Sequence, residues 1–214
     1  MRRALCIIVV ALASATSARM AGAQELPAPV LGEPYEDRDP DRHRRGWAEP
    51  DFVRLQYGGW IGAMNIAAGY AALDDVVNVS VGFGFTPQQL GGQEVLNVDV
   101  TLALRPFHID LGARDWTLVP LELGGALMYV FGDQYHVAVP SRYPSGYYPP
   151  TALHWLAHVG VELAWQPRHG LFARQAIFYR ATTLDTFAMS FLENRDRLDV
   201  LDVVSSAVGY RVDF

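Results

Sequence analysis

Apolar and polar residues alternate along the chain from Phe52 onward, in short segments that turn residues separate. In the last segment Val208 and Tyr210 share one parity, while Arg211 and Asp213 take the other. Successive side chains of a β-strand point to opposite faces, so each segment predicts a strand with one apolar and one polar face. Eight strands are predicted, at residues 52–61, 64–73, 76–86, 94–107, 116–131, 151–165, 171–187 and 201–214.

This succession of strands predicts an all-β protein, folded as an up-and-down antiparallel transmembrane β-barrel of about eight strands. Alternation alone does not say which face is inside, because a soluble barrel encloses its apolar face and a transmembrane barrel its polar face. The connections favour the transmembrane barrel. Those after even-numbered strands are short, as at Asp74-Asp75, whereas two after odd-numbered strands, 132–150 and 190–200, are long. A barrel with both termini in the periplasm has this asymmetry.

The first 23 residues have the pattern of a cleaved export signal. Two arginines precede an apolar run that is too short to span a membrane, and Ala21-Gly22-Ala23 supplies the small residues of a cleavage site. Residues 24–51 are rich in proline and charge and have no apolar period, so we predict a flexible periplasmic leader. The barrel is expected to occupy residues 52–214.

The composition excludes several classes of protein. All 17 basic residues are arginines, against 23 acidic residues, and the formal net charge is −6. No basic surface is left to attract nucleic acid, so none is expected as a partner. The single cysteine, Cys6, lies in the predicted signal, so no disulfide is expected to stabilise the fold. After the signal no apolar run approaches the roughly 20 residues of a membrane helix, so a membrane location requires a closed barrel.

The last predicted strand closes on Phe214, with Tyr210 four residues before it. An amphipathic final strand of this kind resembles the assembly signal of bacterial outer-membrane β-barrels. At the level of architecture the chain is similar to the small eight-stranded OmpA-like and OmpX-like barrels. The resemblance implies a place in the bacterial outer membrane, contact with membrane lipid and lipopolysaccharide, and the barrel-assembly machinery as a partner during biogenesis. It implies no cofactor, and the oligomeric state stays open.

Under this reading the polar face of each strand lines the lumen. An eight-stranded barrel is only just wide enough for its side chains to fill it. Buried charges are costly unless they are paired, and both signs are present. We therefore predict a network of ion pairs and hydrogen bonds that plugs the lumen, which argues against a diffusion pore. The predicted network consists of Arg54, Asp99, Arg105, Glu122, His154, His158, Glu162, Arg174, Arg180 and Arg211.

Three of these residues, His154, His158 and Glu162, share one strand with a spacing that would suggest metal ligands on a helix. A strand rises about 3.3 Å per residue, which puts successive members roughly 13 Å apart. One zinc ion, with nitrogen ligands about 2.0–2.1 Å away, cannot bridge them. No metal site is expected, and hydrogen-bonded side chains that fill the lumen are the favoured interpretation.

The longest predicted loop, residues 133–150, carries the other candidate chemistry. Its prolines restrict the chain, and its tyrosines offer rigid amphipathic surface, as in many recognition loops. One hypothesis is a binding surface for a ligand, a partner or lipopolysaccharide sugars, with the arginine available for phosphate. The other is a loop folded over the barrel mouth, and the two stay open. The residues concerned are Tyr135, Arg142, Tyr143, Tyr147 and Tyr148.

The sequence favours a non-catalytic integral outer-membrane protein with a structural or surface-interaction role. The first alternative is an enzyme that modifies outer-membrane lipid, such as a lipid A acyl hydrolase or transferase. Deacylases of this size carry a His-x-Ser pair, and none occurs in this chain. The second alternative is a narrow channel through the lumen.

Overall fold

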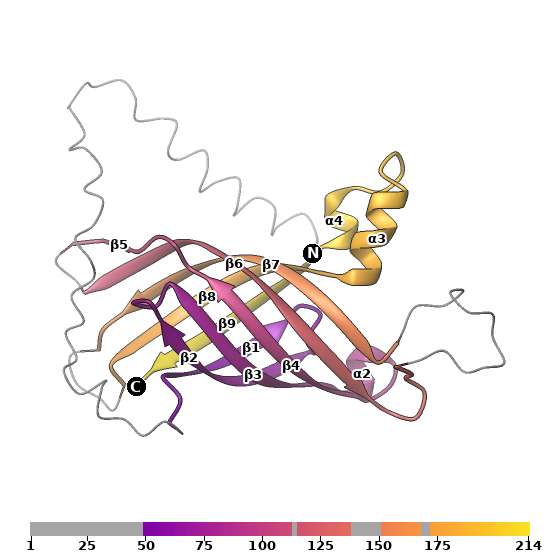
Figure 1. Ribbon diagram of the computed structural model, residues 1–214, viewed down its shortest axis with the longest axis horizontal. Coiled ribbons are helices and arrows are strands. Elements are labelled where there is room, and N and C mark those ends of the chain that lie inside the picture. The colour runs from indigo at the N-terminus through magenta and orange to yellow at the C-terminus, as the bar shows by residue number, and fades with distance from the viewer. Residues whose placement is uncertain (1–48, 113–114, 138–150, 168–171) are drawn as a thin grey trace. The chain divides into compact units, whose positions relative to one another are not determined.

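The computed structural model describes residues 49–112, 115–137, 151–167 and 172–214. Eight antiparallel strands follow one another around a barrel, which closes because β1 pairs with β9 and β4 with β6 (Figure 1). The predicted all-β, up-and-down barrel of eight strands is confirmed. A ninth strand, β5 (Ile109–Asp110), adds a two-residue ladder to β6. The barrel strands are β1 (Phe52–Gly58), β2 (Met64–Ala72), β3 (Val77–Thr86), β4 (Val95–Leu104), β6 (Trp116–Phe131), β7 (Leu153–Trp165), β8 (Arg174–Leu184) and β9 (Ser205–Asp213).

Two of the predicted strands were too long. The segment 171–187 ends as a strand at Leu184, and 201–214 begins as one only at Ser205, because the helices α3 (Asp185–Glu193) and α4 (Val200–Val203) lie between them. Within α3 the aromatic residues Phe187 and Phe191 are four apart, which is the spacing of one helical face. A third short helix, α2 (Gln88–Gly91), lies between β3 and β4.

The first hairpin is also longer than predicted. Strand β1 stops at Gly58, because Gly58 and Gly59 have φ angles of 82° and 77°, the left-handed conformation that glycine adopts readily. The Gly59 N–H then donates to the carbonyl oxygen of Ser206 at 3.0 Å instead of continuing the ladder with β2. The connection therefore spans residues 59–63 and not the expected pair at 62–63.

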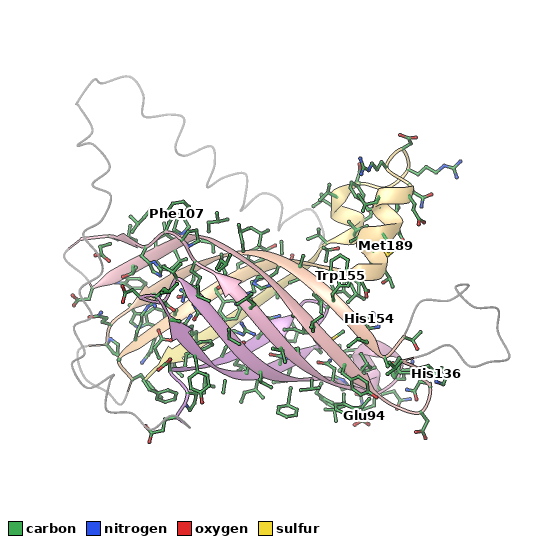
Figure 2. All side chains as sticks on the ribbon, in the orientation of Figure 1. Glu94, Phe107, His136, His154, Trp155 and Met189 are labelled. Atoms are coloured by element: carbon green, nitrogen blue, oxygen red, sulfur yellow. The ribbon has the colours of Figure 1, made fainter. Side chains whose placement is uncertain are left out.

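The two ends of the barrel differ. We call the end with the connections β2–β3, β4–β6 and β7–β8 the turn end, and the end with α2, α3, α4 and the β6–β7 connection the loop end. Figure 2 shows Phe107 near the turn end and Glu94, His136 and His154 at the loop end. Among the described residues, no helix is both long enough and apolar enough to cross a membrane.

The barrel has its polar residues inside and its apolar residues outside. Within the eight strands, all of which are described, no charged side chain lies on the outer face; each one points into the lumen. The outer face instead presents large apolar side chains from every strand. Those more than about a third exposed are Leu55, Tyr57, Met64, Ile66, Tyr70, Val79, Val81, Phe83, Phe85, Leu96, Val100, Leu102, Leu104, Leu123, Leu127, Tyr129, Phe131, Leu153, Trp155, Val159, Val161, Ile177, Val208 and Tyr210.

The lumen itself changes character along its length. Buried charges fill the turn end and the middle, whereas the loop end holds an apolar cluster. Trp60, Val95, Tyr135 and Leu184 pack against this cluster from the rim. The lumen is therefore closed by ion pairs at one end and by apolar packing at the other. The buried members of the apolar cluster are Ile61, Ala126, Met128, Val130 and Leu156.

A β-bulge in β6 places Glu122 in the lumen. Val119 pairs with Glu162 and Glu122 with Gly160, so three residues of β6 advance where β7 advances two. Pro120 lies in this gap, where its missing N–H removes no ladder hydrogen bond. The extra residue exchanges the two faces of the strand, and Glu122, Ala126 and later even-numbered residues therefore point inward.

Glycines on the inner face make room for large polar neighbours. A Cβ on Gly124 would lie 2.5 Å from Nε2 of His158 and 2.5 Å from the carbonyl oxygen of Leu102. A Cβ on Gly160 would lie 3.0 Å from Cγ of Arg180. Gly160 thus accommodates an arginine, whereas Gly124 accommodates a histidine.

We expect Gly124→Ala to destabilise the barrel by about 1–3 kcal/mol, the usual cost of overpacking a filled interior. The added methyl group would clash with the backbone carbonyl oxygen of Leu102. A backbone atom in a strand cannot move aside as the end of a flexible side chain can. The midpoint of urea unfolding in detergent measures the effect. Gly125→Ala is the control, because its Cβ would point outward and meet one carbonyl oxygen at 3.1 Å. Equal midpoints for the two variants would contradict the packing described here.

Candidate functional site

The turn end of the lumen is organised around the carboxylate of Asp75, which lies in the β2–β3 connection. Its Oδ2 accepts from Arg105 at 2.6 Å and from Arg174 at 2.7 Å, and its Oδ1 accepts from Arg211 at 3.0 Å. Arg105 directly follows β4, Arg174 belongs to β8 and Arg211 belongs to β9. One carboxylate from a turn thus connects three separate parts of the barrel wall.

Two further carboxylates complete this cluster. Glu162 accepts from Arg105 and, at 2.7 Å, from Arg174, while Asp213 accepts from Arg211 at 2.6 Å and from Arg174 at 3.3 Å. Three guanidinium groups therefore face three carboxylates, and the cluster is neutral. The Arg211 guanidinium also lies over the Phe52 ring, 4.1 Å from its centroid. Buried charges are tolerated only when they are paired in this way.

The turn that carries Asp75 has an unusual backbone. Leu73, Asp74 and Asp75 have φ angles of 54°, 53° and 66°, so three consecutive residues other than glycine are left-handed. Each such residue costs on the order of 1 kcal/mol or more. The Val76 N–H donates to the carbonyl oxygen of Leu73 at 3.1 Å, and Asn78 Nδ2 donates to that of Asp75 at 2.9 Å. These bonds and the three arginines hold the turn against its strain.

The surroundings of Asp75 decide its protonation. Burial raises the pKa of this carboxyl, but Arg211, Arg105, His108 and Arg174 lower it by more, so the pKa lies well below its usual range. Asp75 is therefore an anion at neutral pH. Because the three arginines are matched by only three carboxylates, losing this anion would leave a guanidinium without its partner.

A second cluster lies in the middle of the lumen around Glu122. Its Oε1 accepts from Arg180 Nε at 2.6 Å and lies 3.2 Å from Nε2 of His158, while its Oε2 is 3.8 Å from Nε of Arg105. Arg180 also donates to Gln56 at 3.3 Å. The contact with Arg105 links this cluster to the one at the turn end, so the charges form one continuous network.

Asp99 of β4 and Arg54 of β1 are the two remaining charged residues of the described lumen wall. Asp99 accepts from Asn65 at 2.6 Å and from Thr101 at 2.9 Å. Arg54 donates to Ser80 at 3.5 Å and, among the described residues, has no carboxylate within ion-pair distance. A cavity of about 10 Å³ adjoins it, which is about the space that one water molecule needs.

The three residues of β7 that share a spacing make separate contacts. His158 faces Glu122 and Glu162 faces two arginines, as described above. His154 lies at the loop end, where its Nδ1 is 3.0 Å from Asp185 and its Nε2 is 3.1 Å from the carbonyl oxygen of Thr151. Within the described residues, no group of three His, Cys, Asp or Glu side chains is arranged to hold a metal ion.

The structure brings together most of the residues of the predicted network. Arg54, Asp99 and His154 are placed outside the two clusters. Asp213, which lies on the predicted inward face but not in the predicted network, and Asp75, which was not predicted to face inward, are central members. The inward parity of Asp213 indicates its place in the lumen. Asp75 follows Asp74 in a tight connection, and nothing in that pair shows which carboxylate turns inward.

The structure describes only part of the longest predicted loop, residues 133–150. Arg142, Tyr143, Tyr147 and Tyr148 lie outside the described residues, as do the predicted signal and all of the leader except residues 49–51. Tyr135 is half-buried and packs against the apolar cluster at the loop end. At this one position the side chain contributes to closing the barrel mouth.

Comparison with protein-family models, with curated proteins and with solved structures finds no match to the chain. The geometry of the barrel therefore carries the functional argument.

We expect Asp75→Asn to destabilise the barrel by about 3–5 kcal/mol, because removing one partner of a buried ion pair leaves the other charge uncompensated. Asp74→Asn is the matched control, since Asp74 shares the left-handed backbone but is exposed. Urea unfolding of both variants in detergent at neutral pH measures the difference. If Asp75→Asn lowered the free energy of unfolding no more than Asp74→Asn does, Asp75 would not be the buried ion-pair partner described here.

The stability lost in Asp75→Asn should also depend on pH. A carboxyl whose pKa is depressed by folding stabilises the folded state fully above its unfolded pKa of about 3.9, and this contribution is lost as the pH falls through the folded pKa. The stability difference between the wild type and Asp75→Asn should therefore narrow as the pH is lowered below about 4. A difference that stays constant down to the acid limit of the barrel would argue against an ionised Asp75.

Proposed function

We propose that this protein is a non-catalytic integral protein of the bacterial outer membrane, with a structural or surface-interaction role. The observation that carries the proposal is the distribution of side chains on the closed barrel. Every charged residue of the eight strands faces the lumen, and the outer face is a continuous apolar band. Outer-membrane barrels have this arrangement, and barrels in water have the opposite one.

The size of the apolar band supports a bilayer as its surroundings. Soluble monomers rarely expose a contiguous apolar patch larger than a few hundred Å². Here Val81, Val100, Leu127 and Val159, from four different strands, are each between 45% and 61% exposed. Lipid tails cover such a band at no cost, because all backbone groups of a closed barrel are already paired.

Aromatic residues near both ends support the same surroundings. At the turn end Trp165 lies against Trp116, with ring centroids 5.4 Å apart, and against Tyr210 at 6.1 Å. At the loop end Tyr129 and Phe131 are 5.1 Å apart, edge to face. Aromatic girdles at two levels mark the interfaces of a membrane barrel. Membrane lipid and lipopolysaccharide are the partners that this proposal implies, and the barrel-assembly machinery is the partner during biogenesis.

The filled lumen favours a structural role over a channel. Ion pairs occupy the turn end and the middle, apolar side chains occupy the loop end, and the cavity beside Arg54 has a volume of about 10 Å³. The alternative of a lipid-modifying enzyme lacks comparable support. Both ring nitrogens of His154 already face oxygen acceptors, so this histidine is not poised to activate a hydroxyl group. A lipid A mass profile that changes with the protein would favour the enzyme.

The first test is gel migration of the protein from isolated outer membranes. A closed barrel resists detergent until it is heated, so the unheated and boiled samples should migrate differently and the protein should fractionate with the outer membrane. Recovery from the soluble periplasm without a mobility shift would overturn the proposal.

Planar bilayers test the filled lumen. The purified protein should insert without producing discrete conductance steps, because no continuous water path crosses the network. Heat-shifted mobility of the same preparation is the control that it is folded. Reproducible steps from folded protein would make the channel the better interpretation.

A further inference from the structure

The connection between β8 and β9 forms a helical hairpin whose exposed face is apolar. Helix α3, the exposed turn 194–199 and helix α4 make up this hairpin, which stands out to one side of the barrel at the loop end (Figure 1). Four large apolar side chains of the hairpin are exposed to solvent. They are Met189 (56%), Leu192 (57%), Val200 (58%) and Leu201 (71%).

The hairpin is firmly attached to the barrel, so its exposed face has a defined position. The Phe187 ring stacks on Trp60 with centroids 4.4 Å apart, and Thr183 donates to the carbonyl oxygen of Val203 at 3.0 Å. Val203 itself is buried. These contacts use the face of the hairpin that carries Phe187 and Val203. The other face, with Met189 and Leu192, is exposed and has no contact of this kind with the described residues.

The attachment point connects the hairpin to the apolar band. Strand β7 extends beyond β8, so Leu153 to Trp155 pair only with β6. Asp185, the first residue of α3, accepts from the free N–H of Trp155 at 3.3 Å and contacts His154 at 3.0 Å. Trp155 is 46% exposed on the outer face and belongs to the apolar band. Figure 2 labels Met189 on the hairpin and Trp155 on this stretch of β7.

We infer that the α3–α4 hairpin lies in the lipid leaflet at the loop end, with Met189, Leu192, Val200 and Leu201 at the boundary between headgroups and acyl chains. This inference rests on the proposed membrane location. The arrangement is that of an amphipathic interfacial element, because the polar turn with Asn194, Arg195, Asp196 and Arg197 is exposed at the far end from the barrel.

Apolar contact, and not charge, carries this interaction. The turn and helix ends hold Arg195 and Arg197 but also several acidic residues, Glu193, Asp196, Asp199 and Asp202, so the hairpin is not basic. Attraction to anionic headgroups is therefore unnecessary, and a zwitterionic leaflet should accept the hairpin. A second copy of the chain is the weaker occupant, because four side chains fall well short of the roughly 800 Å² per partner of a stable interface.

Single-cysteine reporters test the inference. The chain has one cysteine, Cys6, within the predicted signal, so a cysteine introduced into the barrel can be labelled selectively with an environment-sensitive fluorophore. Leu192→Cys and Leu201→Cys report on the two helices, Asp196→Cys on the polar turn, and Leu127→Cys on the apolar band of β6. Each variant also carries Cys6→Ser, so that only the introduced cysteine is labelled. Each labelled protein is then reconstituted into phosphatidylcholine vesicles with and without a nitroxide near the headgroup end of the acyl chain.

We expect the labels at 192 and 201 to lose fluorescence to the nitroxide as strongly as the label at 127, while the label at 196 is unaffected and is quenched by aqueous iodide. Labels at 192 and 201 that iodide quenches, or that neither quencher reaches, would overturn the inference, the second result indicating coverage by protein. In both cases quenching at 127 would leave the proposed function intact. No lipid quenching at 127 would overturn the proposed function itself.

Discussion

The narrow lumen is the constraint on which the rest of this structure depends. An eight-stranded barrel has no room for a layer of water between its side chains, so each charge that faces inward must find its partner in the protein. The described lumen meets this condition almost completely, since its arginines and carboxylates are equal in number and nearly all are in direct contact. The arginines are Arg54, Arg105, Arg174, Arg180 and Arg211, and the carboxylates are Asp75, Asp99, Glu122, Glu162 and Asp213.

Local backbone irregularities serve this pairing. The bulge at Pro120 turns Glu122 inward. The left-handed turn at Leu73 to Asp75 brings a carboxylate from outside the strands into the turn end of the lumen. Neither feature improves the ladder of hydrogen bonds around the barrel. Both are explained by electrostatics, because Glu122 is the carboxylate partner of Arg180, and Asp75 gives Arg174 and Arg211 a second carboxylate each. Strain in the backbone is thus offset by ion pairing in the lumen.

The alternation of side chains was enough to predict the barrel and its strand number, because the period of a strand is a local property. Alternation together with the lengths of the connections predicted the inward position of residues such as Arg180 and Arg211. Partner choice was not predictable in the same way, since it depends on register and on closure of the ring. Asp75 was read as part of a short turn. Asp185 was read as part of a strand, although it begins a helix and satisfies the free edge of β7.

The two ends of the barrel therefore differ in what they leave available for interaction. At the turn end Asp75 is held by three arginines, and any ligand that took one of them would leave a buried charge unpaired. At the loop end the lumen is closed by apolar packing around Met128 and Leu156, which tolerates changes at the rim without such a penalty. We therefore assign the surface role that we propose to the loop end.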